Sequence, residues 1–255
     1  MSTSFVLAHI SDLHIGAGVG PAGRDAASGL RAALQAIAKR EPDAILATGD
    51  LVNDAKPEEY AELAAILADA PVPVYLLPGN HDDPDLLRAA FPGYAYLPRS
   101  GALSYAVEAY PVRIVAIDET IRGEVGGDFT EDHARWLEAT LAEAPHKPTI
   151  VALHHPPFAS HDRLFDTLGL AGAGRFARVI ARHGQVQRIL CGHHHRVVLG
   201  AVAHAPAIMA PSTAWSYDLA LRANEQVGRR TAEPCGFLLH VWSSSSGLVS
   251  HFFAS

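Results

Sequence analysis

Residues 5–14 read FVLAHISDLH, an apolar run that is followed at once by Asp12 and His14. Four later apolar runs repeat this arrangement of a strand-like segment with a polar cluster at its end. The clusters are Gly49-Asp50, Gly79-Asn80-His81-Asp82, His154-His155-Pro156-Pro157 and Gly192-His193-His194-His195. In an open α/β sheet, ligands bind beyond the carboxyl ends of the strands. The five clusters are therefore predicted to converge on one site.

Apolar runs alternate with amphipathic stretches over the first two-thirds of the chain, which is the rhythm of βαβ units. We expect strands at 5–10, 44–47, 72–77, 113–117, 149–153 and 188–191, and helices at 29–40, 57–68, 130–143 and 174–183. Beyond His195 we expect strands at 197–203, 207–209, 235–242 and 248–253, with a hairpin turn at 243–247. The sequence predicts an α/β fold of four layers, α/β/β/α, in a single domain over residues 1–255. Residues 196–255 form its β-rich part, whose strands are expected to extend a second sheet.

Composition narrows the class of protein. The chain has 255 residues, 49% of them hydrophobic, which is enough to bury one substantial core. Its formal net charge of −7 argues against general binding of nucleic acid or of an anionic membrane, since phosphate backbones are held by clustered Lys and Arg. The two cysteines, Cys191 and Cys235, argue against a disulfide framework, and no segment approaches a membrane span. We expect a cytoplasmic protein that captures phosphate locally, through metal.

The side chains in the clusters suit a particular metal chemistry. Carboxylates, imidazoles and one amide oxygen are ligands for borderline divalent ions such as Mn, Fe, Zn or Co, and the ligand set does not choose among them. Two such ions close together can share a carboxylate, clamp a phosphorus centre and lower the pKa of a bound water. The sequence therefore predicts two divalent metal ions and hydrolysis of phosphate esters.

The motif series resembles the calcineurin-like metallophosphoesterases over most of the chain. It consists of Asp12-x-His14, Gly49-Asp50-x-x-Asn53, Gly79-Asn80-His81-Asp82, His154-His155-Pro156-Pro157 and Gly192-His193-x-His195. Within that superfamily the resemblance is closest to the bacterial class III cyclic nucleotide phosphodiesterases and their glycerophosphodiesterase relatives. It implies that Asp12, His14 and His195 bind a first metal, that Asn80, His154 and His193 bind a second, and that Asp50 bridges both.

The resemblance also implies a mechanism and an assembly. The nucleophile would be a metal-bound hydroxide. His81 would be a catalytic residue and not a ligand, either donating a proton to the leaving oxygen or stabilising charge on the phosphoryl group. Relatives are often dimers or higher oligomers, which implies a homodimer or higher homo-oligomer here.

Residues beside these positions have alternative roles. Asp82 orients the His81 imidazole or caps the next helix before Pro84. Asn53 stabilises the loop that carries Asp50 or reaches toward the substrate. His155 and His194 line the cavity and contact substrate, as Asn80 and His81 are expected to, or support a ligand, or have no role and are only carried along by strand geometry. His161 and Asp162 lie in a loop where the family places part of the pocket rim.

Other polar and aromatic residues have simpler explanations. His9 lies inside the first strand and is expected to be packed there. Two adjacent arginines in the loop-like stretch 226–230 are interpreted as a solvated surface, with a phosphate clamp as the alternative. The aromatic residues of the tail are core by default, with pocket wall or subunit interface as alternatives: Trp215, Tyr217, Phe237 and Trp242.

The leading hypothesis is a hydrolase of small phosphodiesters, of the cyclic nucleotide or glycerophosphodiester type. A phosphomonoesterase is the second enzymatic reading, because the same two-metal clamp accepts either substrate. The alternative from a different functional class is a binding protein that has this fold, acts as a scaffold in an assembly and has lost catalytic activity. Filled ligand positions argue against that scaffold.

Overall fold

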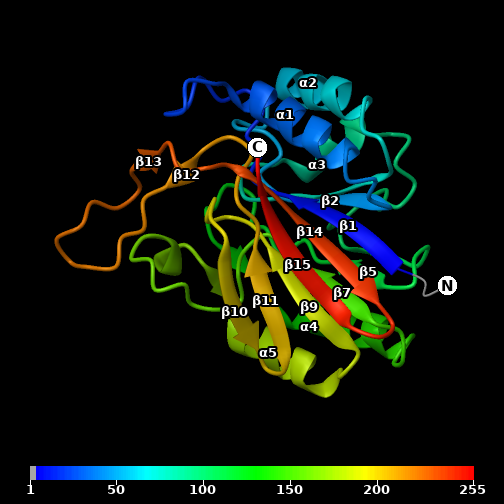
Figure 1. Ribbon diagram of the computed structural model, residues 1–255. Helices are drawn as coiled ribbons and strands as arrows, with labels where there is room; N and C mark the ends of the chain where they lie inside the picture. Colours follow the sequence, from blue (N-terminus) through cyan, green and yellow to red (C-terminus); the bar gives the residue numbers. More distant parts are fainter. Residues whose placement is uncertain (1–3) are drawn as a thin grey trace.

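The computed structural model describes residues 4–255, which form two β-sheets packed between two layers of helices (Figure 1). The first sheet has the strand order β15-β14-β1-β2-β3. Its strands are β1 (Ser4–Ile10), β2 (Ala44–Thr48), β3 (Val74–Leu77), β14 (Gly236–Ser243) and β15 (Gly247–Ala254). Because β1, β2 and β3 are parallel, their carboxyl ends meet at the same edge of the sheet.

The second sheet has the strand order β10-β11-β9-β7-β5-β4. Its strands are β4 (Tyr105–Val107), β5 (Arg113–Ala116), β7 (Thr149–Ala152), β9 (Val186–Cys191), β10 (Val198–Val202) and β11 (Ala205–Met209). Strands β5, β7, β9 and β11 run parallel, while β4 and β10 are antiparallel edges. Short strands β6 (Gly127–Asp128), β8 (Leu170–Ala171), β12 (Ser216–Tyr217) and β13 (Arg230–Thr231), with the 3-10 helix η1 (Phe165–Thr167), lie in the loops.

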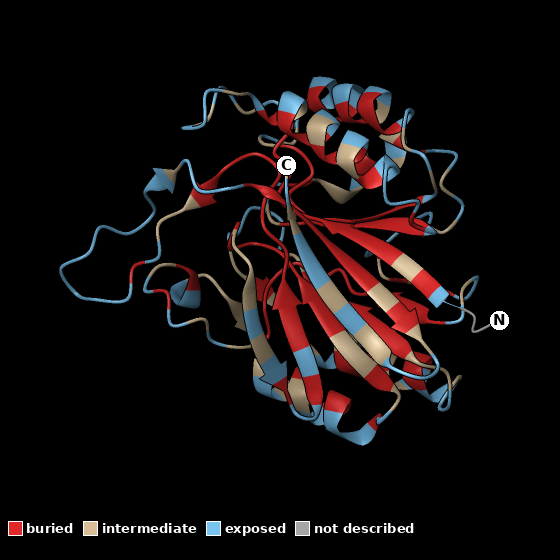
Figure 2. Ribbon diagram, in the orientation of Figure 1, coloured by how far each residue is buried: buried red, intermediate tan, exposed pale blue. Residues whose placement is uncertain are grey.

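Helices cover the outer face of each sheet. Helices α1 (Ala26–Ala38), α2 (Pro57–Leu67) and α3 (Pro84–Ala90) pack on the first sheet, and α4 (Glu131–Ala142) and α5 (Ala173–Arg182) pack on the second (Figure 1). Strands covered on both faces are mainly apolar, as in β2, where every residue is buried and only Thr48 is polar (Figure 2). The predicted four-layer α/β/β/α arrangement is confirmed.

Capping hydrogen bonds from side chains fix where two of the helices begin. Helix α1 begins where the Asp25 carboxylate accepts a hydrogen bond from the Ser28 amide, 2.7 Å away. Helix α4 begins where the Thr130 hydroxyl accepts from the His133 amide, and the His133 ring accepts from the Thr130 amide in return. His133 therefore has a structural role at this helix terminus.

The expectation for the last two strands was wrong in one respect. β10 and β11 extend the second sheet, but β14 and β15 join the first, because β14 pairs antiparallel with the free edge of β1. The hairpin turn expected at 243–247 is present, with Ser243 opposite Gly247. The edge strand β4 and the helix α3 were not among the expected elements.

Within residues 4–255, no helix is both long enough and apolar enough to cross a bilayer. The cytoplasmic location and the single-domain organisation stay predictions.

Candidate metal centre

The predicted ligands lie directly beyond five strand ends, where the edges of the two sheets meet. Strands β1, β2, β3, β7 and β9 end at Ile10, Thr48, Leu77, Ala152 and Cys191. The residues that follow them are Asp12, His14, Asp50, Asn80, His154, His193 and His195, of which all but Asn80 are buried. A bridge between Ser11 and Ser212 fastens the tip of β1 to the segment after β11. Both sheets therefore contribute to one buried cluster.

The backbone at this cluster is in a conformation that most residues avoid. Five of the predicted ligands have positive φ angles: Asp12 at 52°, His14 at 45°, Asp50 at 49°, His193 at 74° and His195 at 57°. Such angles cost free energy for residues other than glycine and concentrate at functional sites. The surrounding fold must hold these residues in place.

Two glycines allow the close packing behind the cluster. A side chain at Gly49, whose φ is 96°, would meet the His154 ring at 2.5 Å. A side chain at Gly192 would meet the Ser11 hydroxyl oxygen at 1.9 Å and the Asp12 carboxylate at 2.8 Å. Only glycine lets these strand ends approach so closely.

Four residues converge on one point, and we call them the first ligand group: Asp12, His14, Asp50 and His195. The Nε2 atoms of His14 and His195 lie 3.0 Å apart. His195 Nε2 is 3.4 Å from Asp12 Oδ1, and His14 Nε2 is 3.6 Å from Asp50 Oδ2. Four potential ligand atoms thus face a common centre.

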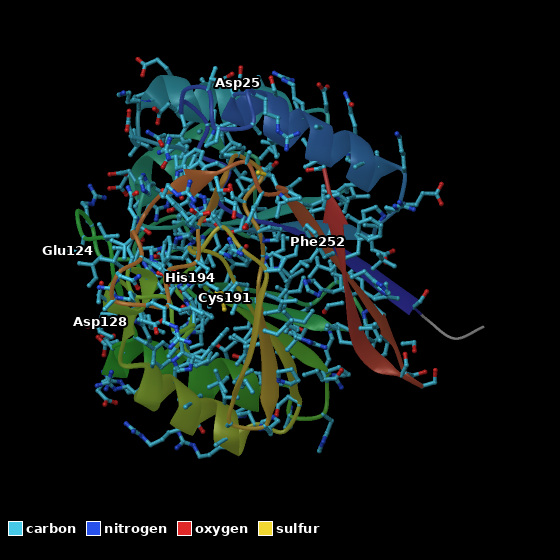
Figure 3. All side chains as sticks on the ribbon, turned by 60° about the vertical axis from the view of Figure 1, so that its left-hand side comes forward. Asp25, Glu124, Asp128, Cys191, His194 and Phe252 are labelled. Carbon is cyan, nitrogen blue, oxygen red and sulfur yellow. The ribbon has the colours of Figure 1, made fainter. Side chains whose placement is uncertain are left out.

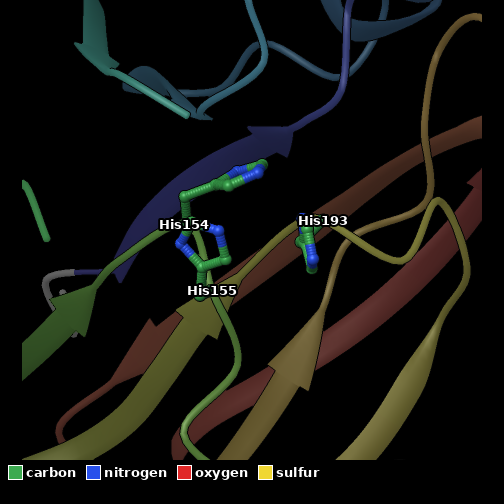
Figure 4. A group of neighbouring side chains, drawn as sticks. All are labelled: His154, His155 and His193. Carbon is green, nitrogen blue, oxygen red and sulfur yellow. The ribbon is translucent and has the colours of Figure 1, made fainter. Parts of the chain in front are cut away.

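The second ligand group consists of Asp50, Asn80, His154 and His193. Asn80 Oδ1 lies 3.2 Å from His154 Nε2 and 3.1 Å from His193 Nδ1. His154 Nε2 is 3.4 Å from Asp50 Oδ1. Figure 4 shows how His154 and His193 approach each other from β7 and β9. Asp50 turns one carboxylate oxygen to each group, as a bridging ligand would.

Hydrogen bonds on the far side of two imidazoles determine which ring nitrogen faces the site. His195 Nδ1 donates to the Trp215 carbonyl oxygen at 2.9 Å, and His154 Nδ1 donates to the Thr48 carbonyl oxygen at 2.7 Å. In a neutral ring this leaves a lone pair on each Nε2, directed at the cluster. Lone pairs and carboxylate oxygens that face one another need a cation between them, so the residues fit divalent metal.

Burial and the charges of neighbouring groups shift the pKa values of the ligand side chains. Burial lowers the pKa of His14 to about 3 and the pKa values of His193 and His195 well below their usual range, so these rings are neutral. Burial, with the nearby charge of Asp50, raises the pKa of Asp12 to about 7. Burial opposes the charged form of His154, but Asp50 and Asp12 raise the pKa of that ring to about 10. The protonated His154 ring therefore supplies positive charge beside Asp50 and Asp12, as a bound metal ion would.

His81 lies on the solvent side of the cluster. Its side chain is exposed, and its ring contacts the His14 ring edge-on with centroids 4.8 Å apart. Its Nδ1 donates to the Asn53 carbonyl oxygen at 2.6 Å, and its amide donates to Asp50 Oδ1 at 2.9 Å. Nε2 is therefore the ring atom left to exchange a proton with a bound molecule.

Asp82 neither orients the His81 ring nor caps helix α3, the two roles expected for it. Its carboxylate accepts from the amides of Leu51 and Gly79, at 3.0 and 2.8 Å, and from the Tyr60 hydroxyl at 3.1 Å. It makes no contact with the His81 ring, and Asp83 caps α3 instead. Asp82 holds the loop after Asp50 against the loop after β3, and thereby supports the bridging residue.

Asn53 acts through its backbone. Its carbonyl holds the His81 ring, while its side-chain amide donates to the Asp54 carboxylate at 2.8 Å. The side chain is thus engaged beside the loop rather than directed at a substrate.

Substituting Asp82 with alanine is expected to destabilise the fold. The change removes the acceptor for buried amides, and each unsatisfied donor costs on the order of 1–3 kcal/mol, so we expect a loss of about 3 kcal/mol or more. Denaturant unfolding of the metal-free protein measures it. Asp85→Ala is the matched control, because the Asp85 side chain is 70% exposed and only ion-pairs with arginines at the surface. Equal midpoints for the two variants would contradict this role.

His155 is buried and has both ring nitrogens bonded within the protein. Nδ1 lies 3.0 Å from Glu119 Oε1, and Nε2 lies 2.8 Å from the Val125 carbonyl oxygen. Its ring is also 4.6 Å from that of His193 (Figure 4). The geometry supports a role in holding the loop from Glu119 to Val125 beside the second ligand group, and leaves no ring nitrogen for a substrate. Glu119 was not singled out in the sequence, although it follows the end of β5 as the ligands follow theirs.

His194 is buried and packs against an aromatic residue. Its ring lies 4.5 Å from Phe165, and it lines a cavity of about 280 Å³ with Pro156, Phe158 and Leu170. Figure 3 places it inside the molecule near Cys191, at the end of β9. Any contact of His194 with a bound molecule would be made in that cavity.

The loop after Pro157 contains one structural carboxylate. Asp162 is buried and accepts from the amides of Leu164 and Ala220, at 2.9 and 3.0 Å. His161 is exposed, with a φ of 64°. Asp162 therefore ties this loop to the segment around residue 220.

Trp215 lies against the ligand histidines, which corresponds to the pocket-wall alternative rather than to the core default. Its ring lies 4.6 Å from that of His14 and 5.1 Å from that of His195, and Tyr217 lies 4.8 Å from His195. Phe237 and Trp242 are in the core as expected, and His9 is buried as well.

Comparisons with known proteins agree with this geometry. The family model described as calcineurin-like phosphoesterase matches residues 5–197. The chain is 31% identical over 221 residues to the glycerophosphodiester phosphodiesterase GpdQ of Enterobacter lignolyticus, covering 82% of this chain and 77% of that protein. It is 32% identical over 246 residues to a probable cyclic nucleotide phosphodiesterase of Rhodococcus erythropolis, covering 94% of this chain and 80% of that one.

Solved structures share the fold at low identity. A dimetal phosphatase from Danio rerio aligns over 98% of both chains with a TM-score of 0.69 and 15% identity. GAP50, an anchor in the inner membrane complex of Plasmodium, aligns with the same TM-score over 98% of this chain and 84% of that one, at 13% identity. The family match, the identity to these phosphodiesterases and the clustered Asp and His side chains lead to one assignment: the chain belongs to the calcineurin-like phosphoesterase family.

Proposed function

We propose that this protein is a phosphodiesterase that hydrolyses small phosphodiesters with two divalent metal ions. The observation that carries the proposal is the placement of Asp50 between the two ligand groups, with one carboxylate oxygen turned toward each. Relatives named as glycerophosphodiester and cyclic nucleotide phosphodiesterases support the diester substrate class. The metals are Mn, Fe, Zn or Co, and the homo-oligomer stays a prediction.

The chain's own residues account for positioning and proton handling. Two divalent ions, when bound, supply positive charge to a phosphate group and lower the pKa of a water molecule. Asp12, His14 and His195 would hold one ion, Asn80, His154 and His193 the other, and Asp50 both. His81, with Nδ1 held by the Asn53 carbonyl, presents Nε2 to protonate the leaving oxygen. A cavity of about 360 Å³ begins at Asn80 and is lined further by Asp118, Thr120 and Arg122, giving room for a small ester group.

The test combines metal analysis with matched substrates. Elemental analysis should find about two metals per chain. Turnover of an aryl phosphodiester should exceed that of its monoester and should disappear on chelation. Faster turnover of the monoester would instead favour the phosphatase alternative. A protein that stayed inactive after reloading with each of the four metals would favour the scaffold alternative.

Metal affinity is expected to rise with pH. In the metal-free chain the pKa of Asp12 is raised to about 7 and that of His154 to about 10, so both groups hold protons more tightly than usual. A metal ion must displace these protons, and below pH 7 there are more to displace. Calorimetric titration with Mn²⁺ at pH 7, in two buffers of different ionisation enthalpy, should show release of about one to two protons per chain. An affinity that did not change between pH 6 and 8 would contradict this charge arrangement.

A further inference from the structure

Arg230 lies over the aromatic wall of the first ligand group. Strand β13 pairs antiparallel with β12, and this register places Arg230 opposite Tyr217. The loop between the two strands projects from the layered body, whereas β13 returns toward it (Figure 1). The guanidinium carbon lies 3.8 Å from the centroid of the Trp215 ring, a cation–π contact.

The Trp215 ring contacts both this guanidinium and the imidazoles of the first ligand group. That ring is 2% exposed and lies 4.6 Å from the His14 ring. Its backbone carbonyl accepts from His195 Nδ1. Trp215 is therefore positioned by its contacts with His14 and His195, and its ring positions the Arg230 guanidinium.

Arg230 is solvent-exposed and differs from Arg229 in its ion pairing. Arg229, next to it, forms an ion pair with Asp218. Arg230 makes no side-chain ion pair or hydrogen bond with any residue in the range 4–255.

Like charges repel, so the Arg230 guanidinium near the first ligand group opposes the binding of metal ions there. An anion that arrives after the metals would benefit from it. The stacked guanidinium keeps its N–H edge free, and its planar fork matches two oxygens of a phosphate. Stacking on Trp215 also reduces the side-chain entropy lost on binding.

We propose that Arg230 is a substrate-binding residue that donates hydrogen bonds to the phosphate ester anion from the Trp215 side of the metal centre. The inference rests on the proposed function, and it replaces the interpretation of residues 226–230 as a solvated surface. It predicts that Arg230, and not Arg229, contributes to affinity for phosphate esters.

The test compares Arg230→Met with Arg229→Met in metal-loaded protein. Methionine keeps an unbranched chain over Trp215 but removes the charge and the donors. We measure KM and kcat for an aryl phosphodiester, and the Kd of phenyl phosphate by calorimetry. Loss of a charge-assisted contact should raise KM and Kd about tenfold or more in Arg230→Met, with kcat changed less than about threefold. Arg229→Met should stay within about twofold of wild type.

Three results would overturn the proposal: an unchanged Kd in Arg230→Met, equal weakening by both variants, or loss of bound metal in Arg230→Met. If tryptophan fluorescence shows that Arg230→Met disturbs Trp215, the Arg230→Lys variant tests the contact instead. Lysine keeps the positive charge but lacks the planar pair of N–H donors of the guanidinium. A several-fold rise in Kd is then expected, and no rise refutes the contact. Wild-type protein without diesterase activity would refute the proposed function, whereas the phenyl phosphate titration would still report on Arg230.

Discussion

Replacing Asp50 with alanine is expected to lower kcat/KM for a phosphodiester on the order of 10⁴-fold or more, equivalent to about 5 kcal/mol of transition-state stabilisation. The reason is that Asp50 is the residue shared by the two ligand groups, with Oδ2 toward His14 and Oδ1 toward His154. Its removal takes a ligand from each proposed ion and the negative charge that holds the two ions close together. Elemental analysis of Asp50→Ala should therefore find well under one metal per chain.

The control for this variant is Asp54→Ala. Asp54 is a carboxylate in the same loop, but it is 48% exposed and ion-pairs with Lys56 outside the site. It should retain both metals and wild-type activity. Melting of the metal-free proteins separates a site effect from a folding effect. An Asp50→Ala protein that held two metals would refute the bridging role.

Replacing His81 with alanine is expected to leave the metal content unchanged and to lower kcat by about 10² to 10⁴-fold. The ring is exposed, is fixed through Nδ1 by the Asn53 carbonyl and touches the His14 ring, so it faces an incoming substrate without ligating metal. If Nε2 protonates the leaving oxygen, the loss should be largest for esters with poor leaving groups and small for nitrophenyl esters. Single-turnover rates across a series of leaving groups measure this dependence.

His204→Ala is the matched control, since His204 is an exposed histidine in the turn between β10 and β11. It should behave as wild type toward every leaving group. A His81→Ala protein that lost its metals would show that His81 is a ligand. Equal losses for good and poor leaving groups would point instead to charge stabilisation on the phosphoryl group.

Much of the site could be predicted from the sequence, because it depends on local features. Short apolar runs that end in Asp, Asn or His are visible without coordinates, and a parallel sheet brings such ends to one edge. The four-layer fold follows from the alternation of apolar and amphipathic segments in the same way. Both predictions needed only residue type and order.

Neighbours across the fold could not be predicted in this way. The pattern of β14 shows a buried strand but not its partner, and pairing with β1 depends on which sheet edge is free. Asp82 precedes a helix, so a capping role was reasonable, yet its carboxylate binds amides brought from the Asp50 loop. Both outcomes depend on contacts between segments distant in the sequence.

The sequence by itself determined which residues could hold metal and on which strand ends they stand, since these follow from side-chain chemistry and strand periodicity. Only the tertiary structure decided the neighbours of His155, which is bonded to Glu119, and of Arg230, which is stacked on Trp215. The positive φ angles of five predicted ligands also belong to the tertiary structure. The physical reason is that hydrogen bonds and ring contacts depend on distances between atoms far apart in the chain, which residue order does not specify.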